Sequence, residues 1–266
     1  MDNTLRHRVN AGRHAVKNQI DFFNHQFGQV RSDWKEDDTR VTFMDFAISE
    51  KIFTELRGSF PDDDYCSEES NPQDEVLELK SKYAWVLDPV DGTNNYALGF
   101  PTCAISLALL KNGVPVYGFI YDHSRRILLQ GGPEEGVYAG SHRCVVKPTA
   151  MDKHSIIGMH FPLTPEQHKQ AYPIIEELRV RSIGSGALSL AYAATGMMDG
   201  ALDFRVKVWD IAAGYALMLG AGGQFRFLEQ DIFPLETFHV RQPNCPYAAG
   251  TPSFMERIAE CFPPVA

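Results

Sequence analysis

Two aspartates flank a proline in the segment from Trp85 to Tyr96, which reads WVLDPVDGTNNY. The apolar residues at its start are typical of a buried strand, and Pro89 should stop regular pairing because proline has no N–H to donate. The chain is therefore expected to turn there, so that Asp88, Asp91 and the Val90 carbonyl bring their oxygens together. Hard divalent cations take such oxygen ligands. The segment predicts a metal site at the end of a strand.

The residues after Asp91 indicate an anion site beside those carboxylates. Gly92 has no side chain, so a ligand can approach the backbone closely. The N–H groups of Gly92, Thr93 and Asn94 are expected to open a helix, whose N-terminus attracts anions. Asp-Pro and Asp-Gly are also common turn formers, but an exposed turn does not need large apolar residues leading into it. We therefore expect metal ions and a phosphate to share this corner.

The motif from Asp88 to Thr93, DPVDGT, resembles the signature of the inositol monophosphatase family, within the superfamily of lithium-sensitive, magnesium-dependent phosphomonoesterases. Further segments resemble that family in type and order: KEDD at 35–38 followed by Asp45, CSEES at 66–70, and WDIAAG at 209–214. Each alone has an ordinary reading as a charged loop or a helix cap. Four acidic segments in the family's order are much harder to obtain by chance. The matches extend over most of the chain, from residue 35 to residue 223.

The resemblance implies a site that uses metal ions and no protein nucleophile. The implied metal ligands all offer oxygen and are Glu68, Asp88, Val90 through its carbonyl, Asp91 and Asp210. They would hold two or three Mg²⁺ ions that lower the pKa of a water and stabilise the leaving alkoxide. Thr93 and Asp45 would orient and deprotonate that water, with Glu68 assisting as a third catalytic residue. The hydroxide would attack phosphorus in line, because phosphoryl transfer depends mainly on positioning and charge neutralisation.

The same resemblance implies a set of substrate-binding residues. They lie at the signature turn and in the C-terminal half, and are Asp91, Gly92, Thr93, Asn94, Gly184, Ser185, Gly186 and Asp203. The 184–186 stretch also reads as a plain helix start. Asp203 falls where inositol-selective members carry a longer glutamate, so inositol selectivity stays open. Arg205 and Lys207 add positive charge that either contacts a second anionic group or belongs to a solvated strand edge.

The sequence is compatible with several functions. Haloacid-dehalogenase phosphatases separate their two aspartates by one residue, whereas Pro89 and Val90 both lie between Asp88 and Asp91 here, so covalent aspartyl catalysis is disfavoured. A small polyol or sugar phosphate is the expected substrate. Histidinol phosphate and nucleotide 3'-phosphates are alternatives, although Asn94-Asn95-Tyr96 resembles the inositol branch more than the nucleotide branch. A catalytically silent member that binds a ligand or partner is a further alternative, which the complete acidic set disfavours.

The composition narrows the class of protein. A net charge of −9 without a Lys/Arg run argues against binding to a nucleic-acid polymer. The five cysteines are odd in number and scattered, which is typical of reduced thiols in the cytosol. The first residues have no apolar core for a signal peptide, and no stretch approaches the roughly 18 apolar residues of a membrane span. We expect a cytoplasmic enzyme with no membrane contact; a homodimer and lithium sensitivity come from the resemblance alone.

Periodicity places these residues on elements. Apolar residues from Leu5 to Phe27 recur at helical spacing, with Gly12 in the apolar stripe and Gly28 as the stop. A second helix is predicted over 43–56 with Gly58 as its stop, which leaves Asp45 in the first turn. The N-terminal strands are expected at 83–87, 103–110, 114–121 and 126–130, with Lys111-Asn112-Gly113 as a hairpin signal.

The second half of the chain alternates strands and helices. Strands are expected at 155–160, 180–183, 201–204 and 224–228, and helices at 165–178, 187–197 and 209–219. Such alternation favours a sheet covered by helices. The fold class is therefore a mixture of α+β and α/β, and the resemblance implies a layered α-β-α-β-α sandwich. We expect residues 1–266 to form a single phosphatase unit, with an N-terminal half at 1–146 and a C-terminal half at 147–266.

Overall fold

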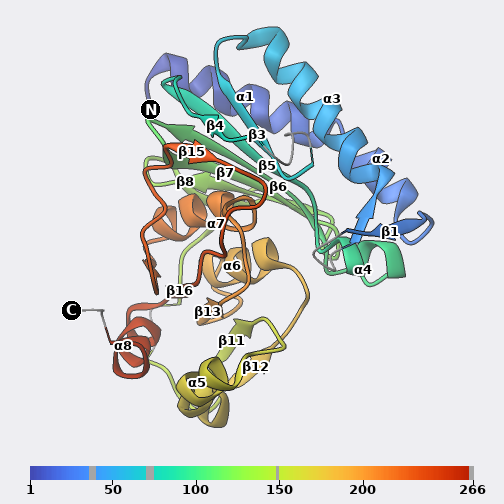
Figure 1. Ribbon diagram of the computed structural model, residues 1–266. Coiled ribbons are helices and arrows are strands. Elements are labelled where there is room, and N and C mark those ends of the chain that lie inside the picture. The colour runs from blue at the N-terminus through green and yellow to red at the C-terminus, as the bar shows by residue number, and fades with distance from the viewer. Residues whose placement is uncertain (36–39, 70–74, 148–149, 264–266) are drawn as a thin grey trace.

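The computed structural model describes residues 1–35, 40–69, 75–147 and 150–263. Five layers follow one another in the order helix, sheet, helix, sheet, helix (Figure 1). This arrangement confirms the layered sandwich that the resemblance implied, and with it the mixed α/β class. Glu36, Asp37 and Asp38 of the KEDD segment, and Ser70 of the CSEES segment, lie outside the described residues.

The first helical layer contains α1 (Asn3–Lys17), α2 (Ile20–Gln26) and α3 (Phe43–Ser59). The predicted apolar stripe is buried at Leu5, Val9, Val16 and Phe23 and partly buried at Ile20 and Phe27. The helix breaks between Lys17 and Ile20. Gly12 marks close packing, since a Cβ there would lie 2.8 Å from the rings of both Phe119 and Trp85. The predicted stop at Gly58 was wrong: α3 continues to Ser59, because a glycine at an open position weakens a helix without ending it.

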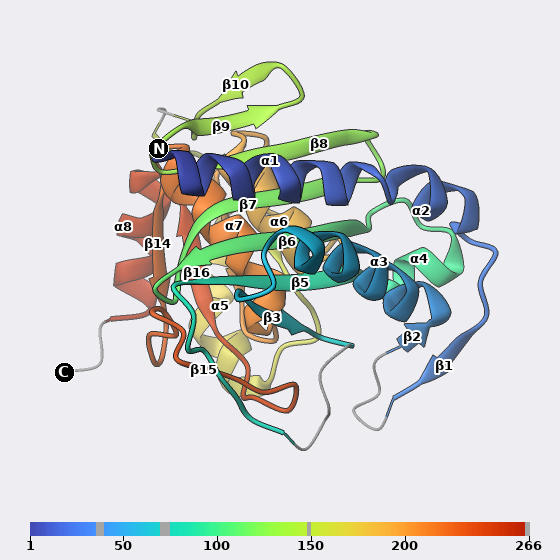
Figure 2. The same ribbon diagram turned by 90° about the horizontal axis from the view of Figure 1, so that it is seen from above.

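The larger sheet lies beneath this layer, and α1 and α3 cross its upper face (Figure 2). Its strands stand in the spatial order β10 (His142–Cys144), β9 (Gly136–Ala139), β8 (Ile127–Gly132), β7 (Val114–Asp122), β6 (Ala104–Lys111), β5 (Tyr83–Asp91) and β3 (Asp64–Ser67). The pairs are antiparallel except that β3 runs parallel to β5. The hairpin signal is confirmed, because Asn112 and Gly113 join β6 to β7 with positive φ.

Pro89 does not end β5. Pairing with β6 runs in register to Asp88 opposite Ser106, and then resumes at Asp91 opposite Ala104. The proline therefore lies in a β-bulge, where an unpaired backbone nitrogen is tolerated. All nine residues of β5 are buried, so the strand carries both aspartates to the sheet's end inside the protein.

The middle layer consists of α6 (Gly186–Ala194) and α7 (Val208–Gly220), which contact the larger sheet on one side. On the other side lies the smaller sheet, in the order β12 (Arg179–Arg181), β11 (Ile156–Met159), β13 (Gly200–Asp203), β16 (Tyr247–Gly250) and β14 (Gln224–Phe227). The last layer is α5 (Pro165–Glu177) with α8 (Pro252–Cys261). Within these layers, the sequence prediction missed β3, β9, β10, β16 and α8.

Two short antiparallel pairs lie outside these layers: β1 (Ser32–Trp34) with β2 (Arg40–Thr42), and β4 (Leu77–Glu78) with β15 (Thr237–Phe238). The β1–β2 pair lies beside α4 (Thr93–Leu98), the short helix after the signature turn (Figure 2). It thereby reaches the end of the larger sheet at which β5 carries its aspartates. In the described part of the chain, no helix is both long and apolar enough to cross a membrane.

Candidate active site

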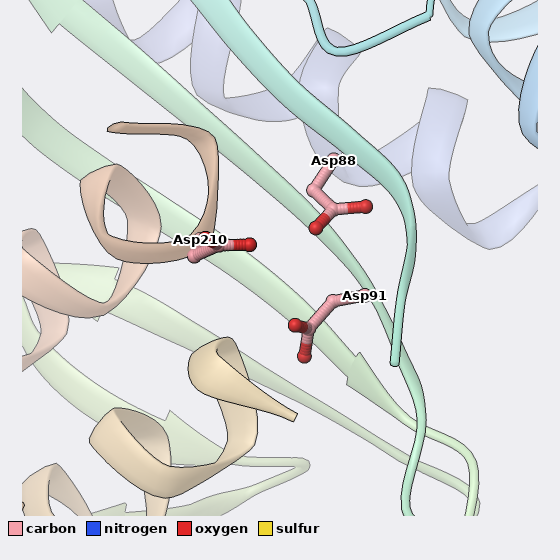
Figure 3. A group of neighbouring side chains, drawn as sticks. All are labelled: Asp88, Asp91 and Asp210. Carbon is pink, nitrogen blue, oxygen red and sulfur yellow. The ribbon is translucent and has the colours of Figure 1, made fainter. Parts of the chain in front are cut away.

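Three carboxylates meet where β5 ends and α7 begins. Asp88, Asp91 and Asp210 each offer one oxygen within 4.8 Å of the others. Figure 3 shows the three side chains turned toward one another, two from the strand and one from the helix. Asp88 and Asp91 are buried, and Asp210 is partly buried. Asp210 follows Asp91 by 119 positions in the sequence, and folding brings it into the same cluster of negative charge.

Local hydrogen bonds fix each carboxylate. Asp88 Oδ1 accepts the Val90 N–H at 3.1 Å, across the bulge. Asp91 accepts the Gly186 N–H at 3.1 Å and the Ser185 hydroxyl. Asp210 lies in the first turn of α7 and accepts the Lys207 N–H at 2.6 Å. These hydrogen bonds engage one oxygen of Asp88, one of Asp210 and both of Asp91, and each carboxylate keeps lone pairs that a ligand can use.

The electrostatics of the cluster favour a cation. Burial raises the pKa of Asp88 well above its usual range, and the charges of Glu68, Asp91 and Asp210 raise it further. Burial and the Asp91 charge likewise raise the pKa of Asp210. For Asp91, burial raises the pKa to about 6 although the Ser185 hydroxyl and backbone N–H groups lower it. Like charges buried together are unstable unless protons or metal ions neutralise them. An all-oxygen donor set of this kind fits Mg²⁺.

Glu68 lies beside this cluster, just beyond β3, and is not part of the three-carboxylate group. Its Oε1 accepts a hydrogen bond from Lys35 Nζ at 2.8 Å. Glu69 Oε1 contacts the same ammonium. The Glu68 charge still reaches the cluster, since it contributes to the raised pKa values of Asp88 and Asp210. The structure thus brings Glu68 near the other predicted ligands, but with Lys35 on one of its oxygens.

The predicted water-activating pair is in hydrogen-bond contact. The Thr93 hydroxyl lies 2.8 Å from the Val90 carbonyl oxygen and 3.3 Å from Asp45 Oδ1. The other oxygen of Asp45 accepts the Thr42 N–H and hydroxyl, both at 2.7 Å, which forms a capping box at the start of α3. Burial raises the pKa of Asp45 to about 6. A carboxylate with a pKa near neutrality is suited to accept a proton.

Glycine is required at the two positions where the halves of the site meet. Gly92 has φ +80°, and a Cβ there would lie 3.0 Å from the Gly184 carbonyl oxygen. Gly184 has φ +71°, and its Cβ would lie 2.7 Å from Asn95 Nδ2. Asn95 in turn donates to the Ile183 carbonyl at 2.8 Å. The start of α6 is therefore tied to α4.

A cavity of about 980 Å³ opens onto the cluster. The predicted residues that line it are Glu68, Asp88, Val90, Asp91, Gly92, Thr93, Asn94, Gly184, Gly186 and Asp210. Asp45 and Ser185 do not line the cavity and act on lining residues instead, through Thr93 and Asp91 respectively. Arg205 and Lys207 both line it.

Asp203 does not line the cavity. Its side chain is buried, with Oδ1 accepting the Arg205 N–H at 2.9 Å and Oδ2 lying 3.4 Å from His160 Nδ1. His160 does line the cavity, and its hydrogen bond with Asp203 raises the pKa of the imidazole. The expected direct contact between Asp203 and the substrate is therefore not supported, because this buried side chain faces His160 and not the cavity.

Sequence reasoning gave no role to several residues of this cavity. Lys35 and Glu69 belong to the KEDD and CSEES segments that resemble the family, and this membership was the signal that could have pointed to them. Trp34 and Arg40 belong to β1 and β2, with the Arg40 guanidinium 4.3 Å above the Trp34 ring. His160 had no signal in the sequence, because it follows β11 in a segment that reads as an ordinary strand end.

The fold and the site together define a two-sheet sandwich with a buried carboxylate cluster suited to divalent metal. The chain belongs to the inositol monophosphatase family, whose family model matches residues 2–263. A fructose-1,6-bisphosphatase/inositol-1-monophosphatase from Aquifex aeolicus is 31% identical over 208 residues, which are 75% of this chain and 77% of the relative. An inositol-1-monophosphatase from Mesorhizobium japonicum is 34% identical over 191 residues, 69% of this chain and 70% of the relative.

Other relatives carry a different name. The Nus factor SuhB of Pasteurella multocida is 35% identical over 190 residues, 69% of this chain and 70% of the relative. Among solved structures, an IMPase from Thermotoga maritima matches with a TM-score of 0.82 at 23% identity, covering 96% of both chains. An IMPase/NADP phosphatase solved with Mg²⁺ and phosphate matches with a TM-score of 0.84 at 18% identity, covering 99% of this chain and 98% of that one. These structures support the fold, and the family is one of phosphatases.

Proposed function

We propose that this chain is a magnesium-dependent phosphomonoesterase that hydrolyses a small polyol or sugar phosphate, such as an inositol monophosphate. The observation that carries the proposal is the convergence of Asp88, Asp91 and Asp210 beside the Thr93–Asp45 contact. A binding protein without catalysis has no need for both features. The metal ligands we assign are these three aspartates, Glu68 and the Val90 carbonyl, for two or three ions.

The chain's own residues supply positioning and proton transfer. When bound, Mg²⁺ would neutralise the phosphate charge and make a water more acidic. Thr93 orients that water, and Asp45 takes its proton through the Thr93 hydroxyl, with Glu68 assisting. The N–H groups at the start of α4, from Gly92 to Asn94, face the phosphate. Ser185 and Gly186 hold Asp91 in place through hydrogen bonds. Together with Gly184, we also assign them to the part of the cavity that contacts the substrate.

Selectivity for the organic part of the substrate is assigned to the wall opposite the signature turn. We keep Asp203 in this role, acting through His160, whose imidazole lines the cavity. Arg205 and Lys207 are also among the residues that line the cavity. Their charge favours a second candidate, a substrate with a second anionic group, and the relative from Aquifex aeolicus is named as a fructose-1,6-bisphosphatase as well.

A substrate panel tests the proposal. Inositol 1-phosphate, fructose 1,6-bisphosphate, histidinol phosphate, 2'-AMP, 3'-AMP and an aryl phosphate are each assayed with Mg²⁺ and with a chelator. We expect metal-dependent release of phosphate, with a polyol or sugar phosphate as the best substrate. No hydrolysis of any member by folded, Mg²⁺-loaded protein would favour a silent member that acts through a partner, as the name Nus factor of several relatives allows.

We further propose that residues 1–266 form one phosphatase unit that works in the cytoplasm as a homodimer. One buried cluster joins residues of both halves, among them Leu110 and Ile120 from the larger sheet with Leu190 and Ala213 from the middle layer. All five cysteines are free, as in a reducing compartment. The dimer rests on the family resemblance, and its mass in solution by light scattering tests it.

A further inference from the structure

The acidic site already contains one positive charge of its own. Lys35 Nζ lies 2.8 Å from Glu68 Oε1 and also contacts Glu69 Oε1. The three side chains are largely buried, with exposed fractions of 17% for Lys35, 19% for Glu68 and 7% for Glu69. A buried ammonium is stable only when it is paired. Here burial disfavours the charged form, and the two carboxylates outweigh it and raise the pKa of Lys35.

Lys35 and a metal ion make competing demands on Glu68. A Mg²⁺ ion binds a carboxylate oxygen at about 2.1 Å. With the ammonium 2.8 Å from Oε1, a metal ion bound to that same oxygen would lie within roughly 5 Å of the ammonium, and the two cations would repel. The ammonium has a second partner in Glu69, which is not among the proposed metal ligands. Lys35 can therefore give up Glu68 without losing every partner.

We propose that Lys35 is a tethered counterion: it holds the cation position beside Glu68 in the metal-free protein, and a divalent metal displaces it onto Glu69. This inference rests on the metal site of the proposed function. It makes Lys35 a residue that sets metal affinity, in addition to the carboxylates that bind the metal. Its presence keeps the metal-free site from carrying several uncompensated negative charges, at the expense of weaker metal binding.

Direct metal binding distinguishes this role from a merely supporting one. Mn²⁺, which can be followed by its electron paramagnetic resonance signal, is titrated into the wild type, Lys35→Gln and Lys35→Arg. A fourth protein, Lys153→Gln, removes the same charge from an exposed turn and serves as the matched control. We expect Lys35→Gln to bind Mn²⁺ about tenfold more tightly than wild type. Lys35→Arg and Lys153→Gln should each stay within about twofold of wild type, since the first keeps the charge and the second changes it far from the site.

Thermal unfolding provides a second readout. Without metal, Lys35→Gln should melt below wild type because Glu68 and Glu69 lose their partner, whereas its gain in Tm on adding Mn²⁺ should exceed that of wild type. Lys35→Met, which keeps the apolar stem, replaces it if the glutamine variant does not fold. Unchanged or weaker Mn²⁺ binding in the folded variants would overturn the inference. If wild type itself bound no more Mn²⁺ than Asp91→Asn, the proposed metal site would fail instead.

Discussion

The Thr93 hydroxyl lies 3.3 Å from Asp45 Oδ1, which joins the start of α4 to the start of α3 across 48 residues of sequence. Because Thr42 holds the other oxygen of Asp45 twice, the carboxylate is fixed in orientation. One side chain therefore carries both the capping interaction and the proton-accepting role that we propose. Under the proposed function, this contact serves proton transfer and not metal binding, which leads to the first prediction.

Removing the Thr93 hydroxyl should reduce turnover and leave metal binding intact. In Thr93→Ala we expect kcat to fall roughly 10²–10⁴-fold, the range for loss of general acid–base assistance. Thr93→Ser keeps the hydroxyl and should recover most of the activity. Steady-state kinetics at saturating Mg²⁺, with Mn²⁺ titrations alongside, measure both effects. A variant with weakened metal affinity but normal kcat at saturation would reverse the assigned roles.

Neutralising Asp91 should abolish metal-dependent hydrolysis. The carboxylate is one of three that converge, and the amide of Asp91→Asn offers a weaker oxygen ligand without charge. The variant should still accept the Gly186 N–H, so the fold is expected to persist. Phosphate release and circular dichroism check activity and folding together. Near wild-type turnover in the folded variant would sink the assignment of the metal site.

The stability of the metal-free protein should depend on pH through Asp45. Its pKa is about 6 in the folded protein and 3.8 ordinarily. Between pH 4 and pH 6 the folded state thus binds more protons than the unfolded state, so stability falls as pH rises through this window and the loss is complete above pH 6. Asp45→Asn cannot lose a proton. Its free energy of unfolding, relative to that of wild type, should therefore rise by roughly 1–3 kcal/mol between pH 4 and pH 6.

Urea unfolding of wild type and Asp45→Asn at pH 4.5 and pH 7, with a chelator present, measures this difference. Asp33→Asn, an exposed aspartate on β1, is the control and should show no such gain. A difference between wild type and Asp45→Asn that does not change with pH would mean that Asp45 stays charged throughout.

Asp203 and His160 should influence which substrate is used. If Asp203 orients His160 toward the substrate's hydroxyl groups, Asp203→Ala loses a charge-assisted hydrogen bond worth roughly 1.5–3 kcal/mol. The specificity constant for the best polyol phosphate should fall by the factor that corresponds to this free energy, roughly 10- to 150-fold. The specificity constant for an aryl phosphate, which has no hydroxyl groups, should hardly change. His160→Gln should reproduce the selective loss. Equal losses on both substrates would make Asp203 a structural residue.

Lithium should inhibit at elevated concentration, as the family resemblance implies. The small ion suits the oxygen donors of Asp88, Asp91 and Asp210. Activity measured across a LiCl series at limiting and at saturating Mg²⁺, with KCl as the ionic-strength control, tests this. An unchanged rate would place the chain outside the lithium-sensitive members and leave the phosphatase proposal in place.

The sequence predicted the parts of the site that local physics determines. Asp88 and Asp91 follow an unbroken apolar strand, and Gly92 has the positive φ that a helix start at this turn requires. The contacts of Asp203 and Lys35 were not predictable in the same way, because they depend on which segments pack together. His160 meets Asp203 only because β11 and β13 are neighbours in the smaller sheet.

The elements missed in the C-terminal region illustrate the same limit. The helix α8 had a local signal, with Thr251 as N-cap and Pro252 at its first position. The strand β16, by contrast, is the short run Tyr247–Gly250, and it is defined by hydrogen bonds to β13 and β14 on either side. Four residues rich in alanine and glycine carry little strand propensity, so the surrounding sheet determines their structure.

The three converging aspartates come from two different layers, two from β5 in the larger sheet and one from α7 in the middle layer. A partly folded chain with only one of these layers in place cannot present all three carboxylates. Under the metal assignment that we propose, tight binding of a divalent ion should appear only when the layers dock, so it can serve as a probe of refolding. The time course of Mn²⁺ uptake during refolding should follow the last step of tertiary assembly and lag behind the recovery of helical circular dichroism.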